Sequence, residues 1–127
     1  MKRLSAAWLM LAFSLPACAE WVTYQRNADT EELYDSAIIS REGKRVKLWT
    51  LTDYAQPITS LEGQELLSEK ALTTLDCESR KVGSEKVMKY SGKRAEGSLI
   101  STMETVLRLT TVRKGSADDA LLERICR

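Results

Sequence analysis

The chain has 127 residues, with 19 lysines and arginines, 18 aspartates and glutamates, and no histidine. This balance of charge argues against a dedicated nucleic-acid-binding protein, which would carry a surplus of basic residues. Without histidine the chain lacks the usual base of a serine or cysteine nucleophile and the commonest metal ligand, so we expect neither an enzyme nor a protein that holds a metal or another cofactor.

The first 19 residues have the three parts of a secretory signal. A basic start at Lys2 and Arg3 is followed by an uncharged apolar stretch over 4–15 and by a small-residue exit over 16–19. A membrane-spanning helix, the alternative, needs about 20 apolar residues, more than this stretch supplies. We therefore predict that residues 1–19 are a signal peptide that is removed. Residues 20–127 would then form one exported domain.

Cys18 lies at the exit of this signal, and two processing routes remain open for it. Residues 17–19 have the small-x-small pattern of ordinary signal peptidase cleavage before Glu20. Residues 15–18, Leu-Pro-Ala-Cys, also resemble a lipobox, in which Cys18 is lipidated and becomes the first residue. The protein would contact a membrane only in the second case.

Two cysteines, Cys77 and Cys126, remain after either route. An even pair in an exported chain predicts a disulfide, and the alternative is two unrelated buried thiols. In the chain-entropy model a bridge across a loop this long stabilises the fold by roughly 4 kcal/mol. That is a large share of the stability of a small domain.

The first part of the exported chain reads as short extended pieces. Residues 21–25 are rich in β-branched and aromatic side chains and predict a strand, whereas residues 27–32 are polar and predict a turn. Residues 33–34 and 37–40 are further extended pieces. The Gly-containing tetrad 41–44 has the composition of a hairpin turn.

Residues 45–53 give the clearest strand. Val46 and Leu48 point to one face, and Trp49 and Leu51 to the other, so both faces carry apolar side chains. We expect a central strand that is covered on part of both sides and ends at Gln56 and Pro57. Because Trp49 shares a face with Leu51, we also expect Trp49 in the apolar layer between the sheet and a helix.

The segment 68–77 is ambiguous, because its leucine spacing favours a helix and its threonines favour a strand. Further on, residues 81–90, 97–103 and 106–112 are strand candidates. Ser116 is a good N-cap for a final helix, with Asp118 and Asp119 in its first turn, where the helix dipole favours acids. Cys126 lies beside Ile125 on the buried side of this helix. Several strands followed by one terminal helix predict an α+β fold.

Two groups of charged residues could carry function. A locally basic segment runs from Lys81 to Arg94, and near its turn Lys89, Lys93 and Arg94 form the candidate partner-binding patch. The alternative is an ordinary solvated face. Among the scattered carboxylates, Asp53 and Asp76 could meet in space as in a glycosidase, which is the minority hypothesis.

The segments described above, taken together, resemble the bacterial surface-adhesin protein E family. The resemblance extends in order over nearly the whole exported chain. Its most specific parts are the segment Trp49-x-Leu51-x-Asp53-Tyr54 and the paired cysteines. The other matching features are Glu20-Trp21-Val22, Tyr34-Asp35-x-x-x-Ile39-x-Arg41-x-Gly43, Val46-Lys47-Leu48, Ser68-x-Lys70-x-Leu72, Tyr90-Ser91-Gly92, Gly115-Ser116 and Leu121-Leu122-x-x-Ile125.

The resemblance implies an antiparallel sheet of about six strands, with a C-terminal helix held on its concave face by a Cys77–Cys126 disulfide, and it favours a strand over 68–77. The named member of the family is an outer-membrane adhesin, which implies an exported protein of a Gram-negative bacterium, in the periplasm, the outer membrane or at the cell surface. It also implies protein partners, with laminin and vitronectin as the candidates, and the basic segment adds acidic glycans. A rival hypothesis is a periplasmic structural or assembly factor without an extracellular ligand. Residues 104–112 lack the tryptophan expected before the final helix, so the ligand-binding region is not transferred residue by residue.

Overall fold

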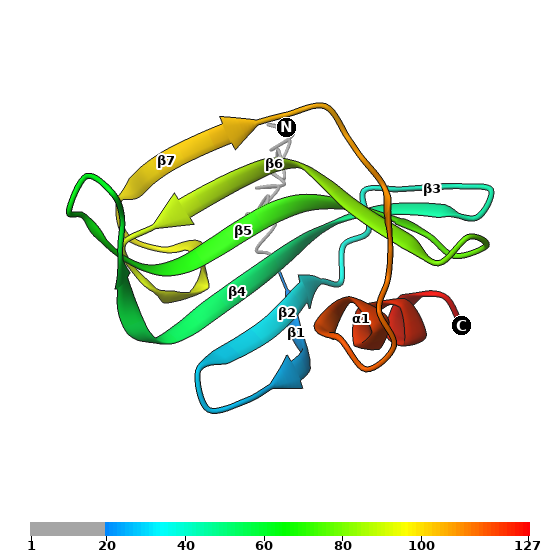
Figure 1. Cartoon of the computed structure of the whole chain (residues 1–127), viewed down its shortest axis with the longest axis horizontal. Coiled ribbons are helices and arrows are strands. Elements are labelled where there is room, and N and C mark those ends of the chain that lie inside the picture. The colour runs from blue at the N-terminus through cyan, green and yellow to red at the C-terminus, as the bar shows by residue number, and fades with distance from the viewer. Residues whose placement is uncertain (1–19) are drawn as a thin grey trace, which may run out of the picture.

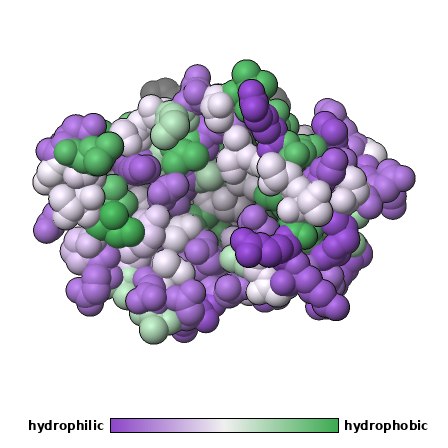
Figure 2. Space-filling view, in the orientation of Figure 1, coloured by the Kyte–Doolittle hydropathy of each residue, from purple (hydrophilic) through white to green (hydrophobic). Residues whose placement is uncertain are grey.

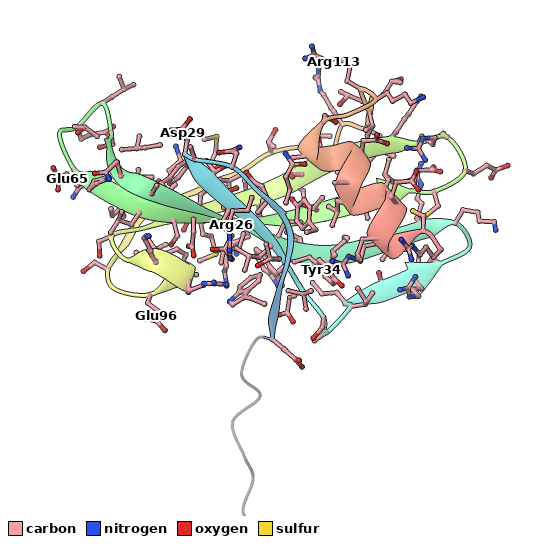
Figure 3. All side chains as sticks on the ribbon, turned by 90° about the horizontal axis from the view of Figure 1, so that it is seen from below. Arg26, Asp29, Tyr34, Glu65, Glu96 and Arg113 are labelled. Atoms are coloured by element: carbon pink, nitrogen blue, oxygen red, sulfur yellow. A yellow bond between two sulfur atoms is a disulfide. The ribbon has the colours of Figure 1, made fainter. Side chains whose placement is uncertain are left out.

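The computed structural model describes residues 20–127 of the chain. They form one antiparallel sheet with the helix α1 packed on one face, and a short 3-10 helix, η1, lies against the other face (Figures 1 and 3). The elements in chain order are β1 (Trp21–Arg26), β2 (Thr30–Asp35), β3 (Ser40–Glu42), β4 (Arg45–Thr59), β5 (Glu65–Asp76), β6 (Lys81–Tyr90), η1 (Lys93–Ala95), β7 (Leu99–Glu104), β8 (Thr110–Thr111) and α1 (Ala117–Ile125).

Six strands follow one another across the sheet in the order β1-β2-β4-β5-β6-β7, and two short strands are added at its sides. β3 pairs with β4, and β8 pairs with β6. The α+β class and the antiparallel sheet are confirmed, with eight strands in the described residues rather than about six. Residues 68–76 of the ambiguous segment 68–77 belong to β5, because their backbone pairs with β4 on one side and β6 on the other.

Several of the predicted boundaries are wrong. Residues 30–32 of the predicted turn 27–32 belong to β2, and Arg41 and Glu42 of the predicted turn 41–44 belong to β3. β4 continues past Gln56 and Pro57 to Thr59. Its pairing with β5 is interrupted after Asp53 and resumes with Ile58↔Leu66 in a shifted register, so Pro57 lies in a stretch of β4 that does not pair with β5. The segment 106–112 contributes only the two residues of β8 to the sheet. Between β7 and β8 the chain leaves the ladder and lies against β6, where the carbonyl oxygen of Arg108 comes within 2.2 Å of the place a Cβ on Gly83 would occupy. Only glycine fits at that position.

The main hydrophobic core lies between the sheet and α1. Val46, Leu48 and Leu75 from the sheet pack with Leu121 and Leu122 of the helix, all at most 3 % exposed. The helix begins as predicted, with the Ser116 hydroxyl oxygen accepting a hydrogen bond from the Asp119 N–H at 3.2 Å. The disulfide Cys77–Cys126 joins the end of α1 to the turn after β5, which confirms the predicted bridge.

A second, smaller apolar layer lies on the opposite face of the sheet. Leu33, Leu51 and Leu66 are at most 3 % exposed, although they are not part of the cluster around α1. We call the two surfaces the helix face, which bears Val46 and Leu48, and the η1 face, which bears Leu51. The prediction that β4 is covered on part of both sides is therefore confirmed.

Candidate binding surface

Arg94 anchors η1 to the sheet through two carboxylates. Its Nε lies 3.0 Å from Asp53 Oδ2 and its Nη2 lies 3.2 Å from Glu31 Oε1, while its backbone N–H donates to Asp53 Oδ1 at 2.8 Å. Asp53 is only 5 % exposed, so this arginine supplies the charge that a buried carboxylate needs. The contact fixes the backbone of Arg94 and Ala95 at φ values of 59° and 57°, a region that non-glycine residues rarely adopt.

Ser68 holds the same turn from β5. Its hydroxyl oxygen accepts a hydrogen bond from the Ala95 N–H at 3.0 Å and donates to the carbonyl oxygen of Gly92. Ser68 is completely buried, so both of its hydrogen-bonding roles are satisfied within the protein. The turn between β6 and β7 is therefore a fixed cover over one end of the η1 face.

The three residues of the predicted basic patch do not lie on one surface. Lys93 and Arg94 are neighbours on η1, and Lys93 is exposed. Lys89 pairs across the sheet with Glu69, the neighbour of Ser68, so its side chain points to the helix face. A role for these residues in partner binding stays a prediction, and the structure gives Arg94 a second role as an anchor.

Glu31, the other carboxylate that holds Arg94, lies at the edge of the η1 face. Its Oε1 accepts hydrogen bonds from the Thr23 hydroxyl at 2.6 Å and from Arg26 Nη2 at 2.9 Å. These two hydrogen bonds, with the charges of Arg94 and Arg26, hold the pKa of Glu31 below its usual value. The same oxygen therefore binds Arg26 and Arg94 together.

Trp49 lies on the η1 face and not against α1, so the prediction for this residue is wrong. Its neighbour Leu48 packs on the helix, and successive side chains of a strand point to opposite faces. The Trp49 ring is partly exposed, and Lys70 Nζ lies 4.5 Å from the ring centroid. This distance is within the range of a cation–π contact.

A row of tryptophan and lysine side chains extends from this contact across the open part of the η1 face. The pairings Trp21↔Asp35, Trp49↔Leu72 and Leu72↔Lys86 place the row on this face, with members on β1, β4, β5 and β6. We call it the tryptophan–lysine strip, and its members, all partly exposed, are Trp21, Lys47, Trp49, Lys70, Leu72 and Lys86.

The lysines of the strip differ in their partners. Lys47 Nζ lies 2.7 Å from Glu85 Oε1, and Lys86 Nζ lies 3.5 Å from Glu104 Oε1. Lys70 takes part in none of the ion pairs formed among residues 20–127. The strip therefore presents one ammonium group, stacked on an indole ring, whose charge no carboxylate of the described chain neutralises.

The helix face carries acidic side chains of a different kind. Glu32 accepts a hydrogen bond from the Thr52 hydroxyl at 2.7 Å, and Glu69 accepts one from the Tyr54 hydroxyl at 3.2 Å. Burial raises the pKa of Glu32 and of Asp118 on α1, and burial together with Glu69 raises the pKa of Tyr54 to about 12. None of these three carboxylates has an ion-pair partner within residues 20–127.

The carboxylates suggested for a glycosidase-like site do not meet. Asp53 pairs with Ser68 and Asp76 pairs with Arg45, eight residues farther along β4. At about 3.3 Å per residue this separates them by roughly 26 Å. Among the residues that the structure describes, no three acidic or cysteine side chains are grouped so that they could hold a metal ion.

Comparison with known proteins gives one result that covers most of the chain. The family model described as surface-adhesin protein E matches residues 21–127. No curated protein matches the chain with significant similarity. Over residues 20–127 no helix is long and apolar enough to cross a membrane. The predicted signal peptide and Cys18 lie outside the described residues.

Proposed function

Because the chain belongs to the surface-adhesin protein E family, we propose that it is an exported envelope protein that acts by binding other proteins and catalyses no reaction. The tryptophan–lysine strip carries this proposal. It combines a partly exposed indole with an ammonium group that has no carboxylate partner in the described chain. Aromatic residues are enriched where proteins bind one another, because they contribute a large contact area.

The charge of the strip favours an acidic partner. Lys70 on the strip and Lys93 on η1 both lie on the η1 face, so they could meet the same acidic surface. We propose host matrix or serum proteins, laminin and vitronectin among them, or acidic glycans as this partner. In the rival hypothesis the protein is a periplasmic structural or assembly factor and has no extracellular ligand.

Surface plasmon resonance with the disulfide-bonded protein tests the proposal, with laminin, vitronectin and heparin as probes at low and high salt. Binding should weaken as salt rises, because exposed charges are screened within about 10 Å at 0.1 M. Lys70→Glu should slow association if the partner binds the η1 face, and Lys89→Glu, on the opposite face, should do so only if the predicted basic residue Lys89 takes part in binding. An effect of Lys89→Glu alone would place the binding surface on the helix face.

Protease shaving of intact cells separates the proposal from its rival. A surface protein should be cleaved by protease added outside the cell, and a periplasmic protein should be spared until the outer membrane is opened. Protection in intact cells, together with no binding to any of the three probes, would favour the periplasmic factor.

A further inference from the structure

The two edges of the sheet are protected very differently. At the β1 edge, α1 packs alongside the strand, Arg124 Nη2 donates to the carbonyl oxygen of Thr23 at 3.4 Å, and the strand has a register irregularity after Thr23. These are ways in which proteins block an edge strand. At the other edge, β7 pairs with β6 on one side and with no described strand on the other.

The hydrogen-bond phase of β7 shows which of its backbone groups point outward. The Thr105 N–H donates to the Glu85 carbonyl oxygen at 3.0 Å. In an antiparallel pair every second residue forms backbone hydrogen bonds to the same neighbouring strand, so Met103 and Ser101 also bond to β6. The N–H and C=O groups of Thr102 and Glu104 therefore point away from the sheet. They form a row of free donors and acceptors along the edge.

The side chains of this edge are also unusually apolar for an exposed strand. Leu99 is 50 % exposed, Met103 58 % and Val106 78 %, and these are half of the six large hydrophobic residues exposed in the described chain. Hydrophobic surface is visible where the chain leaves β7 at the top of the space-filling view (Figure 2). The sequence Leu-Ile-Ser-Thr-Met-Glu contains no proline and no lysine, the residues that commonly protect an edge.

We propose that β7 binds an extended segment of a partner protein, which adds to the sheet as its next strand. Backbone groups of Thr102 and Glu104 would bond to the added strand, as in other cases of strand addition. Met103 points to the helix face beside Val87, and Leu99 points to the η1 face beside Tyr90. The added strand therefore needs apolar side chains that can cover both.

Glu104 selects the charge of the partner. Its side chain is 71 % exposed, and its one ion-pair contact is with Lys86 at 3.5 Å. A lysine or arginine directly opposite on the added strand would complement it. A second copy of this chain fits less well, because an antiparallel pair centred on Thr102 or Met103 places Glu104 opposite Ile100 or Thr102, both neutral. The occupant is thus a segment of another protein with alternating apolar residues and a central cation.

The proposal extends the proposed function from the η1 face to the β7 edge, and a synthetic probe tests it separately. The probe is a fluorescein-labelled nine-residue peptide with valine at alternate positions, threonine at the others and lysine in the centre. Binding to the disulfide-bonded protein is followed by fluorescence anisotropy. Thr102→Pro removes an outward N–H without touching the bonds to β6, and should weaken binding at least tenfold. Thr102→Val is the matched control and should bind within about twofold of the wild type.

Two further measurements use the wild-type protein, so they test the proposal even if the Thr102→Pro variant does not fold. A central glutamate in place of lysine should weaken binding to the wild-type protein by about two- to fivefold, as expected for a cross-strand charge pair. The peptide should also slow hydrogen exchange at the amides of Thr102 and Glu104 in the wild type. Lys70→Glu should leave peptide binding unchanged, so failure of the strip as a binding surface would not be mistaken for failure of the edge.

Several results would overturn the proposal. They are no binding of the lysine peptide to the wild type, equal binding by Thr102→Pro, or binding without protection of Thr102 and Glu104. A dimer in sedimentation velocity that dissociates in Thr102→Pro would also overturn it, because the edge would then be occupied by a second copy.

Discussion

Glu31 and Glu32 are neighbours on β2, yet the fold shifts the pKa values of their carboxyl groups in opposite directions. Glu31 points to the η1 face, where Thr23, Arg26 and Arg94 lower its pKa. Glu32 points to the helix face, where burial raises its pKa despite the Thr52 hydrogen bond, and the charges of Asp118 and Glu69 add to the shift. Neighbouring positions on one strand therefore place one acid beside a hydroxyl and two arginines, and the other in a buried site near two further acids.

The comparison shows that the two faces of this sheet hold their covers by different forces. On the helix face, α1 is held by leucines and by the Cys77–Cys126 bridge. On the η1 face, the turn is held by Arg94 and Ser68 through charge and hydrogen bonds. Substitutions on the two faces should therefore respond differently to reduction, salt and pH.

The largest effect should come from breaking the tether of the helix face. Cys126→Ala should lower the free energy of unfolding by roughly 2–5 kcal/mol, because the unfolded chain is no longer constrained. Denaturant unfolding monitored by circular dichroism measures this loss. Adding a reductant should lower the stability of the wild type toward that of the variant. If reductant did not change the stability of the wild type, the expected role of the bridge would be contradicted.

The anchor of the η1 face should be the next most sensitive point. Arg94→Met leaves Asp53 buried and without its cation, which should cost about 2–3 kcal/mol, less than for a fully buried pair because Arg94 is 41 % exposed. The double variant with Asp53→Asn should recover part of the loss, since the uncompensated charge is gone. Equal losses in the single and double variants would argue that the charge is unimportant.

Substitution of Trp49 tests whether the η1 face is an open binding surface or a second packed core. Because its ring is only partly buried, Trp49→Ala should cost about 1–2 kcal/mol, below the roughly 3–5 kcal/mol expected for a core tryptophan. Tryptophan fluorescence quenching by iodide, compared between wild type and variant, reports the accessibility of the ring. A loss in the core range would show that the strip is packed rather than open.

The smallest and sharpest effects should come from the two glutamates themselves. The lowered pKa of Glu31 stabilises the fold above its unfolded-state pKa, and this contribution disappears as pH falls through the folded-state pKa. The raised pKa of Glu32 has the opposite sign, so its ionisation costs stability as pH rises through and above the unfolded value.

Glu31→Gln should therefore destabilise the protein at pH 7 and do so less as pH falls toward 3, whereas Glu32→Gln should stabilise it at pH 7. Both changes should be smaller than those of the preceding substitutions. Urea unfolding at the two pH values measures them. Shifts of the same sign at pH 7 would show that the two faces do not differ in the way described.

The disulfide, the terminal helix and the strands around Val46 and Val82 follow from local signals that the structure confirms. The side on which Trp49 lies could not be derived in the same way. Alternation along β4 groups Trp49 with Leu51 and separates both from Leu48, but both groups are apolar. Periodicity therefore cannot say which face the helix covers, because that choice is made by packing between distant segments.

The anchor and the strip lay beyond sequence reasoning for a related reason. Arg94 binds Asp53 across 41 residues of chain, and Lys70 meets Trp49 only through the register of the β4–β5 hairpin. That register depends on the irregularity that carries Pro57 through β4. The sequence shows that the segment from Lys81 to Arg94 is basic. Only the register of β6 shows that Lys89 lies on the opposite face from Lys93 and Arg94.

The bridge between Cys77 and Cys126 has a topological consequence for how this protein responds to proteases. Residues 77–126 and the S–S bond together form a closed covalent ring that contains η1, β7 and α1. One peptide-bond cut anywhere in that ring, for instance in the exposed stretch around Val106, opens the loop without releasing a fragment. A protease that cuts there would thus leave a nicked chain of nearly unchanged mass, and the cut would become visible only on a reducing gel.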